Sequence, residues 1–164
     1  MNVLGNGDGN SLANEPKDIV NLPVSILNWF RKAMPTPTKK NRSVQLGVHF
    51  EETAEMTRAC GELHLADRLD HVANLYKNEW DTHYVPDGFD RLELLDGLCD
   101  QIVTAIGTAY GQGFDIIGAL EAVNANNWSK FVNGEPQWTA QGKIAKPATY
   151  TKVDLTPFLG VDPN

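Results

Sequence analysis

The sequence lacks the features that identify several large classes of protein. It has no C-x-x-C or H-E-x-x-H pattern to support a zinc site, and neither the G-x-x-x-x-G-K-[S/T] loop nor the G-x-G-x-x-G fingerprint of conventional nucleotide-binding folds. It also has no run of about 18 apolar residues and no charged-then-apolar leader. We therefore predict no membrane partner and no signal peptide, and we expect a cytoplasmic protein.

Cysteine and positive charge are both scarce. The two cysteines, Cys60 and Cys99, fall within predicted helices, and we expect them to be small core residues rather than a disulfide. Lysine and arginine number 14 against 21 aspartates and glutamates, which gives a formal net charge of −7. Proteins that bind nucleic acid polymers usually present a basic face, so we predict no nucleic acid partner. Any phosphate chemistry must then depend on metal ions and a few well-placed cations.

What the sequence does contain is the hydrophobic periodicity typical of an all-α fold. The apolar spacing predicts five helices, at 24–34, 41–61, 62–80, 90–110 and 115–131. Residues 1–20 lack this periodicity, and we expect a flexible N-terminal tail there. The length fits one helical domain over 21–131 that is large enough to bury a core. Residues 132–164 are rich in proline, glycine and lysine, which favours an extended arm with one short hairpin, packed on the domain or on a neighbouring subunit.

Three glutamates at helical spacing form the first candidate site. Glu51, Glu52 and Glu55 lie within five positions of one predicted helix, so they share a face. Such a run is usually a solvated helix face. Here apolar residues crowd the cluster and no lysine or arginine stands four residues away. This pattern favours binding of a divalent cation through carboxylate oxygens.

Two aspartates form the second candidate cluster. Asp96 and Asp100 are one turn apart in the most apolar predicted helix. Aspartate is unfavourable inside a helix, and a buried unpaired charge is costly. We therefore predict that a metal ion shared with the glutamates compensates the two aspartates. Gly97 beside them leaves room for a ligand or for a close helix crossing.

A third candidate segment combines several amides with a lysine. It reads Asn124-Ala125-Asn126-Asn127-Trp128-Ser129-Lys130. These side chains could cap the end of a helix, or they could hold phosphate oxygens with Lys130 as a point charge. The spacing alone does not decide between these two interpretations.

Taken together, these motifs resemble the all-α nucleoside triphosphate pyrophosphohydrolases, a superfamily of MazG-like enzymes, dimeric dUTPases and phosphoribosyl-ATP pyrophosphohydrolases. The similarity is closest to the MazG-like branch and extends over 24–160. Besides the E-E-x-x-E helix and Asp100, it rests on Gly107-Thr108-Ala109, Gly113-x-Asp115, Asn127-x-Ser129-Lys130 and the tail Gly142-Lys143-Ile144-x-Lys146-x-x-x-Tyr150-x-x-x-Asp154-Leu155. One position departs from the pattern: the glutamate expected three residues before Asp100 is Gly97, and Asp96 stands one position earlier.

The resemblance implies a four- to five-helix bundle of the MazG-like type with an irregular C-terminal arm. It also implies hydrolysis of a (deoxy)nucleoside triphosphate between its α- and β-phosphates, with Mg²⁺ or Mn²⁺ as cofactor, in a homodimer or homotetramer with sites between chains. The metal ligands that it implies are Glu51, Glu52, Glu55, Asp96 and Asp100. One of the three glutamates would orient or deprotonate the attacking water. The expected substrate contacts are Asn124, Asn127, Lys130, Lys143 and Lys146 for the phosphates, and Trp29, Gln45 or Asn41 for the base.

Other functions stay open on the sequence alone. A non-catalytic nucleotide- or metal-binding regulator of the same fold would account for Gly97, and a helical interaction protein with solvated acidic faces would account for the charge clusters. Base preference does not follow from the residues, although we lean toward a purine or (d)GTP-type substrate. The role is equally open between house-cleaning of damaged nucleotides and pool-shaping by a virus-encoded enzyme in the host cytoplasm.

Overall fold

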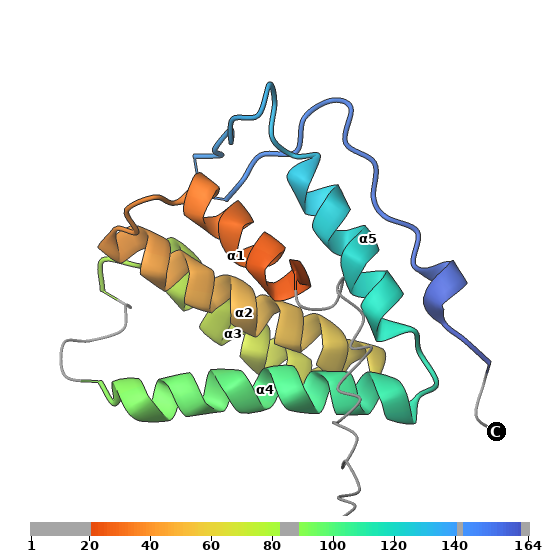
Figure 1. The fold of residues 1–164 in the computed structure, drawn as a ribbon. Helices are drawn as coiled ribbons and strands as arrows, with labels where there is room; N and C mark the ends of the chain where they lie inside the picture. Colours follow the sequence, from red (N-terminus) through yellow and green to blue (C-terminus); the bar gives the residue numbers. More distant parts are fainter. Residues whose placement is uncertain (1–20, 83–88, 141–142, 162–164) are drawn as a thin grey trace, which may run out of the picture.

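The computed structural model describes residues 21–82, 89–140 and 143–161, and within these ranges the chain is helical with no strand. Its elements are α1 Asn21–Ala33, α2 Lys39–Ala59, α3 Leu63–Asn78, α4 Arg91–Gly111, α5 Ile116–Trp128 and the short 3-10 helix η1 Thr156–Phe158 (Figure 1). The predicted all-α fold is confirmed. The predicted N-terminal tail, 1–20, lies outside the described residues. None of the described helices is both long and apolar enough to cross a membrane.

The start of α2 differs from the sequence prediction, which began this helix at residue 41. Thr38 is the N-cap: its hydroxyl accepts a hydrogen bond from the Asn41 backbone N–H at 3.1 Å, and the Asn41 side chain accepts one from the Thr38 N–H at 3.0 Å. This reciprocal pair satisfies two backbone donors that the helix itself leaves free. Ser43 is instead fully buried inside α2 and donates to the Tyr76 carbonyl oxygen of α3 at 2.8 Å.

A close crossing at Gly47 holds α2 against α3. A Cβ atom at Gly47 would lie 2.7 Å from the Ala73 carbonyl oxygen and 2.8 Å from Cγ of Lys77. Both distances are shorter than van der Waals contact, so only glycine lets the two backbones approach this closely. Ala54, Ala66 and Ala73 are fully buried along the same helix pair. Small side chains therefore set the separation of α2 and α3.

We expect Gly47→Ala to lower the free energy of unfolding by about 1–3 kcal/mol, because the added methyl group overpacks a backbone contact that cannot move freely. The effect runs against helix propensity, which favours alanine by about 1 kcal/mol. Gly111→Ala is the matched control, since no atom lies within 4 Å of a Cβ there. Urea unfolding measures both variants, and equal or greater stability of Gly47→Ala would contradict the packing argument.

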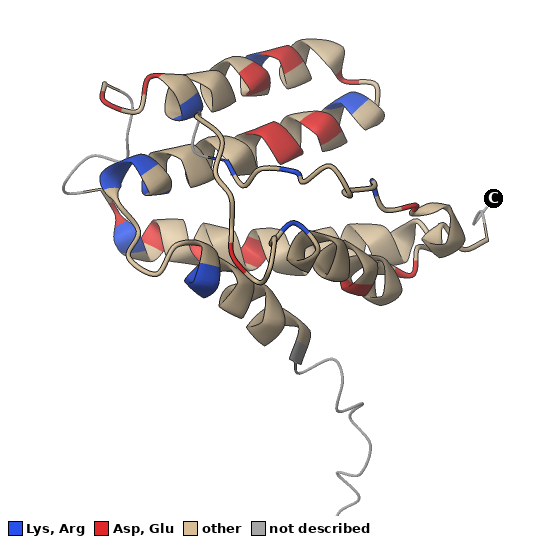
Figure 2. Cartoon of the chain, turned by 90° about the horizontal axis from the view of Figure 1, so that it is seen from above, with Lys and Arg blue, Asp and Glu red and all other residues tan. Residues whose placement is uncertain are grey.

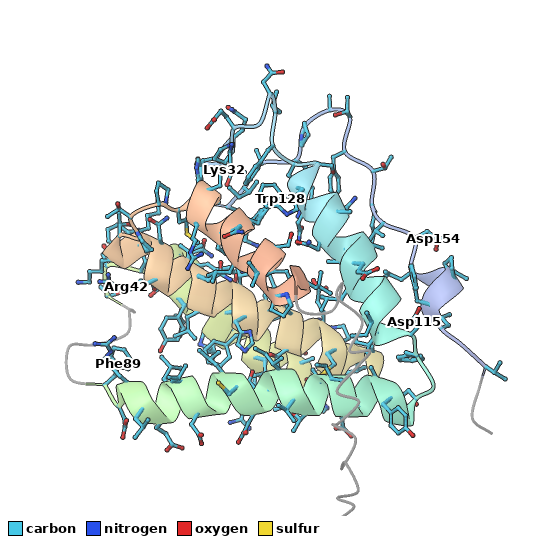
Figure 3. The ribbon with its side chains drawn as sticks, viewed as in Figure 1. Lys32, Arg42, Phe89, Asp115, Trp128 and Asp154 are labelled. Carbon is cyan, nitrogen blue, oxygen red and sulfur yellow. The ribbon has the colours of Figure 1, made fainter. Side chains whose placement is uncertain are left out.

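Helices α1 and α5 form a second pair (Figure 1). Ser25 of α1 accepts hydrogen bonds from Asn124 at 2.9 Å and from the Trp128 indole at 3.2 Å. The Trp29 indole donates in turn to the Asn127 carbonyl oxygen at 2.9 Å. Figure 3 labels Trp128 between the two helices. These bonds hold α5 in register with α1 and bring the segment after Asn127 toward α2.

The C-terminal arm, 132–161 without 141–142, is irregular and crosses the ends of α1 and α5 before it follows α5 to η1 (Figure 1). The isolated bridge between Trp138 and Ile144 marks a reversal like the predicted hairpin. The Asn126 amide donates to the Thr151 carbonyl oxygen at 2.7 Å, and the Asp115 backbone N–H donates to the Phe158 carbonyl oxygen at 2.9 Å. The arm is thus held along its length by polar contacts to the helical body.

Helix α4 is the least packed of the described helices. No Cα atom of α4 lies within 8 Å of a Cα atom of α2 or α3. His49 of α2 reaches it through a hydrogen bond to the Gln101 side chain. The sequence predicted that Gly97 leaves room for a close helix crossing. No described residue makes such a crossing, because no atom lies within 4 Å of a Cβ atom placed at Gly97.

The sequence predicted a buried core, and the core formed by the described residues of one chain is small. The buried apolar side chains of the described residues are Leu22, Ala33, Val44, Ala54, Ala66, Ala73 and Ala109. Large apolar side chains of α4 are exposed instead: Leu92, Leu95, Leu98, Ile102, Val103, Ile106 and Tyr110. The prediction that Cys60 and Cys99 are core residues is wrong, because both are free and exposed. Cys60 caps the end of α2, and Cys99 lies on the unpacked α4.

Candidate nucleotide and metal site

A single cavity of about 560 Å³ brings together most of the residues predicted to form a site. It lies between α1, α2, the end of α5 and the C-terminal arm. Ten predicted residues line it: Trp29, Asn41, Gln45, Glu51, Glu52, Glu55, Asn127, Lys130, Lys143 and Lys146. Its volume is that of an ordinary small-molecule site. Because these residues come from four separate segments, the fold assembles the cavity rather than any local stretch of sequence.

Glu51 is held between two lysines. Lys77 of α3 and Lys143 of the arm each place Nζ 2.7 Å from a different carboxylate oxygen of Glu51. Burial raises the pKa of Glu51, but the hydrogen bonds from Lys143 and Lys77 outweigh that effect, so its pKa lies below the ordinary value. Figure 2 shows the basic positions of the arm running alongside α2, next to its acidic stretch. Glu51 therefore stays ionised and fastens the arm to α2.

Glu52 and Glu55 are the carboxylates that remain available. Neither forms an ion pair or a side-chain hydrogen bond with any described residue. Burial raises the pKa of Glu52 above its ordinary value, and the neighbouring charges of Glu55 and Glu51 raise it further. Both side chains are exposed, and their like charges repel each other, so the pair is stabilised when a cation binds beside it.

A lysine cluster faces these carboxylates. Lys130 Nζ donates to the Asn127 side-chain oxygen at 2.6 Å and lies 5.5 Å from the Tyr150 ring centroid. Lys146 Nζ lies 5.1 Å from the same centroid. Burial lowers the pKa of Lys130, the charge of Lys146 lowers it further, and the charge of Glu52 opposes both. Crowded cations of this kind are stabilised by an anion placed between them.

Three predicted site residues lie elsewhere. Asn124 does not line the cavity but donates to the Ser25 hydroxyl of α1. Asp96 and Asp100 are exposed on α4 and do not line the cavity either. Among the described residues, no three His, Cys, Asp or Glu side chains gather closely enough to hold a metal ion. The structure thus brings the glutamates together with the lysines, and not with the aspartates.

Two residues of the site were not found from the sequence. Lys77 pairs with Glu51 across the α2–α3 contact, whereas the sequence of α2 alone shows only that no cation stands four residues from Glu51. Trp138 lines the cavity from the arm, where no periodicity marked it. Trp29, the predicted stacking residue, stacks on Phe131 at a centroid distance of 5.5 Å and uses its indole N–H within the fold.

The donor set fits Mg²⁺ in chemistry and in number. Mg²⁺ prefers hard oxygen ligands, keeps several waters, and is commonly held by one or two carboxylates together with substrate phosphates. Glu52 and Glu55 supply two such carboxylates with no competing cation within 4 Å among the described residues. Burial and the charges of Glu55 and Glu51 raise the pKa of Glu52, and a cation bound beside it would favour its ionised form. These two glutamates could therefore hold Mg²⁺ when phosphate oxygens and water complete its shell.

Comparisons of the chain with protein-family models, curated proteins and solved structures found no match. The side chains of the cavity are therefore the basis for inferring which ligands the site can bind. Carboxylates and lysines that face one cavity can bind a polyanion together with a divalent cation, since each group offsets a charge that the others leave unpaired.

Proposed function

We propose that this protein is a Mg²⁺-dependent (deoxy)nucleoside triphosphate pyrophosphohydrolase of the MazG-like type, which releases a nucleoside monophosphate and pyrophosphate. The observation that carries the proposal is the convergence of Glu52 and Glu55 with Lys130, Lys143 and Lys146 on one cavity. Phosphoryl transfer depends mostly on positioning and on electrostatic stabilisation. Carboxylates for a divalent cation and lysines for phosphate oxygens are the groups that such catalysis needs.

The three glutamates have different roles in this proposal, because they have different partners in the fold. Glu52 and Glu55 are free to hold Mg²⁺, and the same carboxylates can orient the attacking water and accept its proton. Bound there, Mg²⁺ would supply positive charge to the phosphate oxygens and lower the pKa of nearby water. Glu51 acts differently, because both of its oxygens are committed to Lys77 and Lys143. We assign Glu51 the task of positioning Lys143 at the cavity.

The lysines offset the charge of the triphosphate. Lys130 is held by Asn127 and approaches the cavity beside Glu52. Lys146 lies close to the same Tyr150 ring as Lys130. A lysine ammonium binds phosphate as a compact point charge with three donors. Asn127 is a positioning residue, since its side-chain oxygen accepts from Lys130 and its carbonyl oxygen accepts from Trp29.

The exposed face of α4 supports a homo-oligomer as the active form. Ile102 is 64% exposed and Val103 is 67% exposed, an unusual state for large apolar side chains on a helix. At 3.6 residues per turn, Asp96 stands one heptad before Val103, so the aspartates follow the edge of the same face. Packing this face on a second copy would bury the apolar side chains and would carry Asp96 and Asp100 to the interface, where they can join a neighbour's glutamates.

The test is a panel of canonical and modified (d)NTPs assayed with Mg²⁺ or Mn²⁺, in which pyrophosphate and inorganic phosphate are measured separately. We expect equimolar pyrophosphate and nucleoside monophosphate from at least one nucleotide, and no release in EDTA. Release of inorganic phosphate alone would refute cleavage between the α- and β-phosphates. Nucleotide binding by calorimetry without any release would support the non-catalytic regulator, while absence of both binding and release would leave a helical interaction protein.

A further inference from the structure

One end of the cavity is neutral and aromatic, and this end has no task in the proposed chemistry. Along α2 the lining residues recur about once per turn, from Asn41 through Gln45 and Val48 to Glu52 and Glu55. Gln45 precedes Glu52 by seven residues, which is about 10 Å along the helix axis. Helix α2 therefore places an uncharged pocket beyond the carboxylates, on the side where the sugar and base of a bound nucleotide would extend.

Trp138 is the aromatic side chain that stands at the neutral end. It lines the main cavity and also a smaller adjoining one of about 400 Å³, and Met34 and Asn41 border both. Its side chain is half-exposed, and within the described residues its ring has no aromatic partner and its indole N–H no acceptor. The free ring face distinguishes Trp138 from Trp29, whose ring and N–H are both engaged by the fold.

Backbone hydrogen bonds fix Trp138 next to the phosphate-binding part of the arm. The Thr139 N–H donates to the Lys143 carbonyl oxygen at 2.8 Å, and the Ala145 N–H donates to the Gln137 carbonyl oxygen at 2.7 Å. The reversal between them places Trp138 and Lys143 on one small unit, which the Lys143–Glu51 ion pair fastens to α2. These bonds hold the main chain on both sides of Trp138, and a tryptophan side chain has only two χ angles to order when it binds a flat ligand.

We propose that Trp138 is the stacking platform for the nucleobase and that Gln45 is the side chain that reads the edge of the base. This inference rests on the proposed function, since a nucleotide must bind with its phosphates at the glutamate and lysine cluster. Gln45 is preferred to Asn41 because the side-chain oxygen of Asn41 already accepts two hydrogen bonds from Thr38. The Gln45 amide has no described partner and can donate and accept at once.

The experiment compares Trp138→Ala with Trp138→Phe on the best substrate of the nucleotide panel. Base stacking on an aromatic ring predicts that Trp138→Ala raises KM about 5- to 150-fold with little change in kcat, and that Trp138→Phe recovers most of the loss. Calorimetric binding of the nucleoside monophosphate should weaken in the same ratio. Inhibition by inorganic tripolyphosphate, which has no base, should be unchanged. Trp80→Ala is the matched control, because Trp80 lies outside the cavity.

The outcomes separate this inference from the function on which it rests. If the unaltered protein cleaves nucleotides and Trp138→Ala leaves KM unchanged, the stacking assignment is wrong and the proposed function stands. If tripolyphosphate inhibition weakens as much as nucleotide binding, Trp138 acts by positioning Lys143, which also overturns the assignment. If the unaltered protein neither binds nor cleaves any nucleotide, the proposed function itself fails.

Discussion

Glu52→Gln is expected to lower pyrophosphate release at least about 100-fold while the fold persists. The amide keeps the shape of the side chain but removes the charge that a divalent cation needs. Partial desolvation of Glu52 and the charges of Glu55 and Glu51 raise its pKa, so its ionised form is disfavoured in the protein without metal. The neutral amide removes this repulsion, and we therefore expect the metal-free variant to be at least as stable as the unaltered protein.

Melting temperature with and without Mg²⁺ distinguishes a lost site from a damaged fold. A cation that binds the folded state alone stabilises it by about 2.7 kcal/mol at a concentration of 100 Kd. The unaltered protein should show this gain and Glu52→Gln should lose most of it. Glu62→Gln is the matched control, because Glu62 is exposed at the start of α3 and its side chain does not cap the helix. Full activity in both Glu52→Gln and Glu55→Gln would refute the assignment of the carboxylates.

Helical periodicity was sufficient to predict the helices but not how they meet. The predicted ends of α3, α4 and α5 agree with the structure to within three residues, because apolar spacing, Asp90 and Asp115 as caps, and the glycines after α4 are local signals. The start of α2 was predicted too late, since the Thr38 cap depends on a reciprocal bond with Asn41 that the lysines between them obscure.

The site was predictable where its chemistry is local and not where it depends on packing. Spacing identified Glu51, Glu52 and Glu55 as one face, but only the α2–α3 crossing reveals that Lys77 neutralises Glu51 and leaves the other two carboxylates free. The sequence alone does not distinguish Trp29 from Trp138 as the residue that stacks on a base. The fold does, because the Trp29 ring packs on Phe131 while the Trp138 ring stays open to the cavity.

A charged residue in the centre of the exposed α4 face is expected to dissociate the oligomer. In the proposed assembly Ile102→Asp would bury an unpaired carboxylate against apolar side chains, which costs several kcal/mol. Light scattering should show a fall from the mass of an oligomer to that of one 18.1 kDa chain, with loss of most activity. Leu65→Asp is the matched control, because Leu65 is an exposed leucine on α3 rather than α4. An unaltered protein that is monomeric and active would contradict the proposed assembly.

If Asp100 of one copy joins the glutamates of another, two inactive variants should restore each other. Glu52→Gln and Asp100→Asn are each expected to be inactive alone. In a mixed dimer one site carries both substitutions and the other carries neither, so random exchange of subunits should recover about one quarter of the unaltered turnover. A site built within one chain cannot be restored in this way, because every mixed dimer would keep one defect in each site. Recovery therefore reports directly that Asp100 acts across the α4 interface, and its absence in exchanged dimers would place Asp100 and Glu52 in the site of one chain. Full activity of Asp100→Asn alone would confine the site to Glu52 and Glu55.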